Sequence, residues 1–278
     1  MQIGFRQLPR KFFADRGTHL AAMIAYFALL SFVPLLFCAL ALLGLAGRPD
    51  ESSYFVREVK HVFPDASVGG IVSAFDSVQH HWAALGIVGG VALLWTSLSL
   101  FSVLESAFNI VYGRPNRSFF RGKALSAVLL VGSLIALFLG LVVGTFGFHL
   151  LTRHAGGVIG NEVVAFVLTI LVSSFSVLAF LLAIYVLLTN APLRIRNVLP
   201  GALLATVLLQ VSFQSLPIYL RLTNKVIALQ AFGGLPLLLV WLYVMANVIL
   251  LGAELNWWLQ FGRRPVPDEE LEEAPGLA

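Results

Sequence analysis

Residues 234–259 read GLPLLLVWLYVMANVILLGAELNWWL, and the only charged side chain among them is Glu254. A helix rises about 1.5 Å per residue, so this stretch is long enough to cross the roughly 30 Å hydrocarbon core of a bilayer. A second run without Asp, Glu, Lys or Arg extends from Thr18 to Gly47. Two such runs predict an all-α protein that is embedded in a membrane.

The composition of the whole chain agrees with this prediction. Of its 278 residues, 59% are hydrophobic and 12% are charged, and the mean hydropathy is +0.90. Soluble domains carry about 25% charged residues, so this chain has too few charges to cover a surface exposed to water. Its net charge is +4, but the Lys and Arg residues cluster at the ends of apolar runs. That distribution indicates membrane topology, and we expect no nucleic-acid partner.

Six apolar stretches are long enough to span a bilayer. They lie at about 19–47, 84–110, 124–148, 163–189, 199–220 and 234–259. The fifth is interrupted by Gln210, Gln214 and Pro217. We expect these stretches to form a single six-helix membrane domain over residues 1–262. An even number of spans places both ends of the chain on one side.

Basic residues predict which side holds the two ends, because loops rich in Lys and Arg stay in the cytoplasm. With six spans, 12 of the 18 Lys and Arg residues fall on the side of the two ends. We therefore predict cytoplasmic N- and C-termini. The basic residues before Thr18 would also suit a cleaved signal peptide. The apolar segment of a signal peptide, however, is only about half as long as the run from Thr18 to Gly47.

Two segments outside the spans have distinct patterns. Residues 48–83 hold apolar side chains at helical spacing on both sides of Pro64, which predicts an outer hairpin of two short amphipathic helices. The hairpin would either rest in the membrane interface and cap the bundle or serve only as a structural connection. Residues 263–278 are rich in proline and acidic residues, which predicts a disordered cytoplasmic tail.

Glu105 and Glu254 are the only carboxylates within the apolar spans. Each precedes the cytoplasmic end of its helix by six or seven residues, or about 10 Å of depth. Asn109 and Asn256 follow them closely, so polar groups collect at one level. A carboxylate there is unfavourable unless it faces a partner or water. These residues would therefore either line a cytoplasm-facing cavity for a cation, a proton or a polar head group, or form a hydrogen-bonded cluster that pairs helices.

Other polar residues and a proline lie within the first and fifth spans. Tyr26 and Ser31 precede Pro34, which removes a backbone donor and predicts a kink. The kink would act either as the hinge of a gate or as a packing device. Gln210 and Gln214 share one face of the fifth span, where they would either hydrogen-bond to another helix or line a pathway.

The sequence contains no catalytic or cofactor-binding motif. HExxH, a Walker loop, GxSxG and a dinucleotide-binding GxGxxG are all absent. Its single cysteine, Cys38, cannot form a disulfide or a thiolate cluster within one chain. We therefore expect no enzyme, no cofactor and no bound metal.

Four stretches, in this order, resemble the bacterial YihY/BrkB family of inner-membrane proteins. They are HLAAMIAYFALLSFVPLL at 19–36, FNIVYGRPNRSFFRGKALS at 108–126, LPGALLATVLLQ at 199–210 and FGGLPLLLVWLYVMANVILLGAELNWWL at 232–259. The resemblance implies a six-helix protein of the bacterial inner membrane, with suggested roles in exporting or flipping lipids or siderophore-like amphiphiles. The family also carries a ribonuclease label, but this sequence has no hydrolytic cluster to support it. The positions that match the family's motifs are Tyr26, Ser31, Pro34, Asn109, Tyr112, Gly201, Gly252, Glu254 and Asn256.

We therefore expect a transporter or flippase-like protein for an amphiphilic, anionic substrate. Basic residues at the inner leaflet would attract its head group, namely Arg114, Arg117, Arg121 and Lys123. The candidate pathway residues are Glu105, Asn109, Glu254, Asn256, Tyr26, Ser31, Gln210 and Gln214, with Pro34 as the hinge. The alternative is a scaffold, without transport, for envelope assembly or its regulation. Membrane lipids are the expected partners, and the sequence is compatible with a homo-oligomer.

Overall fold

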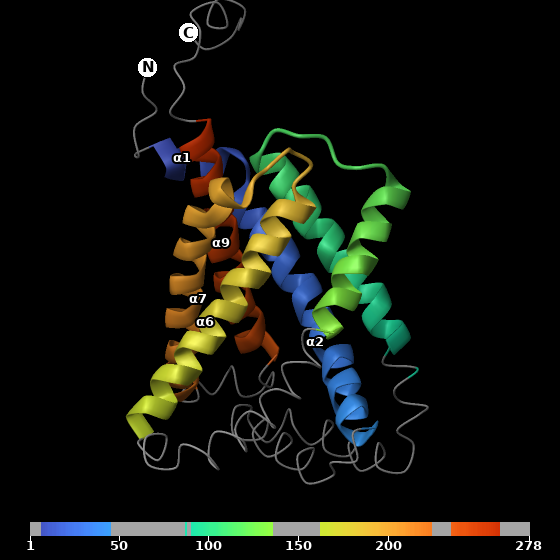
Figure 1. Cartoon of the computed structure of the whole chain (residues 1–278), viewed down its shortest axis with the longest axis vertical. Coiled ribbons are helices and arrows are strands. Elements are labelled where there is room, and N and C mark those ends of the chain that lie inside the picture. The colour runs from blue at the N-terminus through green and yellow to red at the C-terminus, as the bar shows by residue number, and fades with distance from the viewer. Residues whose placement is uncertain (1–6, 46–86, 88–89, 136–161, 224–234, 262–278) are drawn as a thin grey trace, which may run out of the picture.

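The computed structural model describes residues 7–45, 87, 90–135, 162–223 and 235–261 (Figure 1). These ranges are helical apart from short connections and contain no strand, which confirms the predicted all-α class for this part of the chain. The predicted outer hairpin at 48–83 and the predicted acidic tail at 263–278 lie outside the described residues.

The first described element is a short helix, α1 (Gln7–Ala14), which the hydropathy of the chain did not predict. A tight turn follows, in which Arg16 adopts the left-handed conformation with φ 56°. A Cβ at the next residue, Gly17, would lie 2.5 Å from the ring of Phe12. The glycine therefore lets α1 fold back against α2 (Gly17–Leu45), which contains Pro34 within its length.

Two pairs of the remaining helices are each joined by a short connection. Helix Gly90–Val111 is followed by residues 112–118 and by a helix at 119–135. After them come α6 (Glu162–Leu188), α7 (Ile195–Thr223) and α9 (Leu235–Gln260), the first two joined by residues 189–194. Helix α1 and both connections lie at the same end of the molecule, which we name the charged end (Figure 1).

The packing of the bundle centres on α9, which contacts α2, α7 and α1, while α6 packs against α7. Helices α7 and α9 meet at two glycines, since a Cβ on Gly201 would lie 2.0 Å from the carbonyl oxygen of Gly252. Tyr185 of α6 donates a 2.7 Å hydrogen bond from its hydroxyl to the Ile249 carbonyl. Small residues at the crossing allow the helix backbones to approach this closely.

Within the described ranges, four helical segments are long and apolar enough to cross a membrane, namely Gly90–Val111, Ile170–Leu188, Ile195–Ser215 and Pro236–Gln260. Large apolar side chains are exposed on them, among them Trp95, Phe175 and Val211. Such an exposed apolar surface is typical of helices that face lipid. Apart from α1, each described helix overlaps a predicted apolar stretch, whereas the total of six spans stays a prediction.

Candidate functional site

Glu254 on α9 is completely buried, and its charge is opposed by Lys11 on α1. Lys11 Nζ lies 3.1 Å from Glu254 Oε2 and donates a 3.0 Å hydrogen bond to the carbonyl oxygen of Val111. The same ammonium forms an ion pair with Asp15 and lies 4.2 Å from the ring centre of Trp257. We name these four groups, which surround Lys11 Nζ, the ammonium cage.

Helical spacing explains how the cage assembles. Lys11 and Asp15 are four residues apart and therefore share a face of α1. Glu254 and Trp257 are three residues apart and share a face of α9. Val111 ends its helix, where the last carbonyl groups have no intrahelical donor and carry partial negative charge. Each wall of the cage is therefore anionic or electron-rich.

The carboxylate of Glu254 accepts no hydrogen bond at either oxygen within the described part of the chain. Its Oε2 nevertheless lies within ion-pair distance of Lys11, so this contact is electrostatic, without an aligned N–H. An uncompensated buried charge costs several kcal/mol, so the stability of this region depends on the Lys11 charge. That single ammonium is shared between two carboxylates, because it also contacts Asp15.

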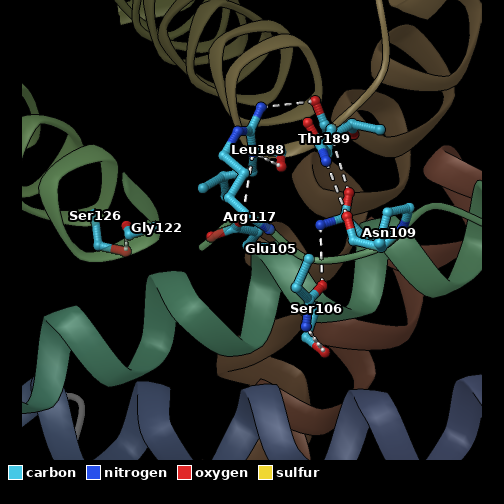
Figure 2. Close-up of polar contacts among 11 residues, drawn as sticks. Glu105, Ser106, Asn109, Arg117, Gly122, Ser126, Leu188 and Thr189 are labelled. Atoms are coloured by element: carbon cyan, nitrogen blue, oxygen red, sulfur yellow. Dashed lines mark hydrogen bonds and ion pairs between the residues drawn. The ribbon is translucent and has the colours of Figure 1, made fainter. Parts of the chain in front are cut away.

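Glu105 is also buried, and its partner is Arg117 in the connection 112–118 (Figure 2). Its Oε1 accepts from the backbone N–H and from Nη1 of Arg117, both at 3.3 Å. The same guanidinium donates to the carbonyl oxygens of Leu188 at 2.6 Å and Thr189 at 3.0 Å. Arg117 therefore ties the helix that carries Glu105 to the end of α6.

Asn109 joins the two connections at the charged end (Figure 2). Its Oδ1 accepts the backbone N–H of Asn190 at 2.7 Å, and its Nδ2 donates to Asn116 Oδ1 at 3.0 Å. Asn190 donates in turn to the Pro115 carbonyl at 2.9 Å, and Asn116 donates to Ser106 Oγ at 3.2 Å. The result is a closed network in which both groups of the Asn109 amide are used.

Asn256 and Gln260 place further polar contacts along α9. Asn256 Oδ1 accepts the backbone N–H of Gly201 at 2.7 Å, whereas its Nδ2 is buried without a partner in the described ranges. Gln260 donates to the Tyr112 hydroxyl at 3.4 Å and to the Asn197 carbonyl at 3.1 Å. Burial raises the pKa of Tyr112 above its usual range, so its phenol stays protonated at neutral pH.

The candidate residues Tyr26 and Ser31 both contact Phe27 of the same helix, α2. Tyr26 is exposed and packs edge to face against Phe27. Ser31 is buried and donates to the Phe27 carbonyl at 2.8 Å, one turn before it. Pro34 is buried inside α2, and the kink and hinge expected there stay predictions. No contact recorded in the described ranges joins Tyr26 or Ser31 to Glu254, so the structure does not gather these residues into one site.

The two glutamines of α7 have different surroundings. Gln210 Nε2 donates to Ser173 Oγ at 2.6 Å and to Ser174 Oγ at 2.8 Å, which links α7 to α6. Gln214 is exposed. Gln210 therefore makes the interhelical hydrogen bonds that were one of the two predicted alternatives.

Two of the four basic residues expected to attract a head group are engaged inside the protein. Arg117 holds Glu105 and the end of α6, as described above. Lys123 donates to Ser102 Oγ at 3.1 Å and to the Leu98 carbonyl at 3.4 Å. Both cations have close internal acceptors that hydropathy could not reveal.

The other two, Arg114 and Arg121, are exposed at the charged end. Between them in the sequence, Phe119 and Phe120 are also exposed, with 71% and 83% of their surfaces accessible. Cationic and aromatic side chains are thus both exposed within residues 114–121. We name these four residues the arginine–phenylalanine surface.

Sequence reasoning missed the contribution of α1. In the sequence, Lys11 counts only among the basic residues before the first span, Asp15 has no assigned role, and Trp257 is only part of an apolar run. The sequence did contain a signal for this helix. Leu8 and Phe12 are apolar and one turn apart, and the structure buries both of them. Their spacing is typical of a short amphipathic helix.

The helices and the buried charges at one end define a multi-pass α-helical membrane protein. A family model described as virulence factor BrkB matches residues 8–275. The chain therefore belongs to the BrkB family, which confirms the resemblance seen in its sequence.

Its relatives include proteins named for their membrane location. The chain is 27% identical over 264 residues to a UPF0761 membrane protein of Chromohalobacter salexigens, covering 93% of this chain and 63% of the relative. It is 30% identical to a UPF0761 membrane protein of Azotobacter vinelandii, covering 94% and 64%. This chain thus spans less than two thirds of the length of either relative.

Another relative, from Bacillus subtilis, is similar in length to this chain. It is the ribonuclease-like protein YfkH, which is 26% identical, with 95% of this chain and 97% of the relative covered. No solved structure matches the chain.

Proposed function

We propose that this protein moves an amphiphile with an anionic group in its head across the bacterial inner membrane, as a transporter or flippase-like protein with cytoplasmic termini. The observation that carries the proposal is the arginine–phenylalanine surface at the charged end. A basic side chain near a membrane contributes about 1 kcal/mol of attraction to an anionic head group. The exposed rings offer an apolar contact for the adjoining tail.

Glu254 supports movement in addition to binding. A charged residue in a spanning helix is costly and typically marks a substrate or ion pathway. Here the compensating charge comes from α1, a helix of eight residues, and not from another spanning helix. The side chain that compensates Glu254 therefore lies at the periphery of the bundle, where exchange requires the least rearrangement.

The test is a lipid-movement assay in vesicles that contain the purified protein. A fluorescent phosphatidylglycerol in the inner leaflet becomes accessible to dithionite only after movement. The double variant Arg114→Gln/Arg121→Gln should slow this movement about thirtyfold at subsaturating probe, since two attractions of about 1 kcal/mol are lost. Glu254→Gln should abolish it.

A matched control is the double variant Arg194→Gln/Arg196→Gln. It removes the same charge from exposed positions near the start of α7. Its rate should stay within about twofold of the unchanged protein, because only diffuse surface attraction is altered. Equal slowing by both double variants would reject a local site. Absence of movement with the unchanged protein would reject the transporter.

The alternative function is a scaffold, and one observation favours it. Glu105 pairs with Arg117, and Asn109 hydrogen-bonds to both connections. Such a network gives a rigid end on which another protein could assemble. If this is the function, alanine at Phe55 or Phe75 in the predicted outer hairpin should impair it more than Glu254→Gln.

A further inference from the structure

We infer that the ammonium cage is a binding site for a primary ammonium group, which Lys11 occupies as an internal ligand and which the amine of a substrate head group enters in its place. The entry of a substrate amine rests on the proposed transport function. The binding of a free primary amine to the cage does not depend on that function, and it is tested separately.

The acceptors of the cage match the chemistry of a primary ammonium. Such a group has three N–H donors and no acceptor. The cage offers the carboxylates of Asp15 and Glu254 and the carbonyl oxygen of Val111 on one side. The Trp257 ring provides a cation–π contact at 4.2 Å. A quaternary ammonium has no N–H and could use only its charge and the ring.

The carboxylate of Glu254 provides a second, independent observation. It is fully buried, and neither of its oxygen atoms accepts a hydrogen bond in the described part of the chain. Lys11 offers one ammonium group to the two carboxyl groups of Asp15 and Glu254. The resident ammonium therefore leaves acceptor capacity in the cage unused.

Lys11 can leave without unfolding α1. Its side chain is 20% exposed and that of Asp15 is 22% exposed, so the cage reaches the molecular surface beside α1. The buried side chains of Leu8 and Phe12 hold α1 in place independently of the ion pair. Rotation about the flexible side-chain bonds of Lys11 would therefore vacate the ammonium position while Asp15 remains.

The position of the cage defines the class of head group. It lies at the charged end, as does the arginine–phenylalanine surface, where Arg114 and Arg121 would attract an anionic group. An amphiphile that carries both a primary amine and a phosphate or carboxylate would use both sites. An aminophospholipid has this chemistry.

The first experiment replaces the Lys11 ammonium with a free one. Lys11→Ala removes three methylene groups and the ammonium, which n-propylammonium can restore. The thermal unfolding temperature of this variant in detergent should fall, and propylammonium chloride at tens of millimolar should recover at least half of the loss. Tetramethylammonium chloride should recover none, and neither salt should shift the unchanged protein.

Lys123→Ala is the matched control, because Lys123 also faces an aromatic ring, that of Phe119 at 5.9 Å, but donates only to neutral oxygen atoms within the described residues. Recovery by propylammonium in this variant, equal recovery of Lys11→Ala by tetramethylammonium, or no recovery would each overturn the inference. If Lys11→Ala does not fold alone, it is purified in propylammonium, which is then removed. Unfolding on removal of propylammonium, but not after purification in tetramethylammonium, supports the cage, and any other result overturns it.

The second experiment measures movement of labelled phosphatidylethanolamine and labelled phosphatidylcholine in vesicles. The unchanged protein should move the primary-amine lipid at least fivefold faster. Amine recovery without movement of either lipid would support the cage and reject the transport function. Equal movement of both lipids would support transport and overturn the assignment of the cage to the substrate.

Discussion

The backbone N–H of Gly201 on α7 donates a 2.7 Å hydrogen bond to the side-chain oxygen of Asn256 on α9. A Cβ at Gly201 would lie 2.5 Å from that same oxygen. The hydrogen bond therefore requires glycine at this position of α7. Since backbone polar groups have no water to bind inside a bilayer, this bond fixes how α7 and α9 cross.

Replacing Asn256 should weaken the contact between α7 and α9. Asn256→Leu keeps a similar volume but leaves a buried N–H without its acceptor, which should cost about 1–3 kcal/mol of unfolding free energy. Unfolding in detergent, followed by tryptophan fluorescence, measures the change. Asn247→Leu is the control, because among the described residues Asn247 donates only to the Tyr243 carbonyl of its own helix. Equal losses in both variants would contradict an interhelical role for Asn256.

Gly252 should not tolerate even one added methyl group. Its Cβ would lie 2.4 Å from the Tyr185 hydroxyl and 2.7 Å from the Gly201 carbonyl oxygen. Gly252→Ala should therefore destabilise the protein by about 1–3 kcal/mol through overpacking. A Cβ at Gly132 would have no atom of the described residues within 4 Å, so Gly132→Ala should be neutral or slightly stabilising. The same detergent unfolding assay distinguishes them, and a neutral Gly252→Ala would disprove the close approach.

Glu105 and Arg117 should show strong energetic coupling. Arg117→Ala removes the counter-charge of the buried Glu105 carboxylate, which keeps the backbone N–H of residue 117, and it removes the donor of two carbonyl groups, at a cost of about 3 kcal/mol. Glu105→Gln made on the Arg117→Ala background should recover part of that loss, because the uncompensated charge is then removed. A double-mutant cycle measures the coupling. Arg114→Ala, at an exposed neighbour, should change stability by less than about 0.5 kcal/mol.

The two glutamines of α7 should respond differently to the same substitution. Gln210→Leu removes hydrogen bonds to Ser173 and Ser174 and should destabilise the pairing of α6 with α7 by about 0.5–2 kcal/mol. Gln214→Leu, at an exposed position, should be neutral. Thermal unfolding of the two single variants, measured side by side, tests this difference. Equal effects would place the glutamines in equivalent environments and contradict the structure.

The orientation of the protein can be measured without any assay of function. Reporter fusions after Arg117 and after Arg153 should lie on opposite sides of the membrane, with Arg117 in the cytoplasm. The physical reason is the excess of Lys and Arg on the side of the two termini. If both fusions report the same side, the number of spans between them is wrong.

The sequence alone determined the class of protein and the approximate extent of the described helices. Runs such as 234–259 are apolar along their whole length, and hydropathy is a local property that needs no knowledge of neighbours. For the same reason Glu105 and Glu254 could be singled out, since each is a charge within an apolar run. The sequence also predicted that Gln210 would need either a partner on another helix or a polar pathway.

Only the tertiary structure decided which groups meet. Lys11 and Glu254 are separated by most of the chain, and their contact depends on α1 folding back against α9. Arg117 is equally basic whether it faces lipid or Glu105, so charge counting could not distinguish the two. Pairing between helices depends on which faces are adjacent and how closely their backbones approach. At Gly201 and Gly252 that approach is set by three-dimensional packing rather than by hydropathy.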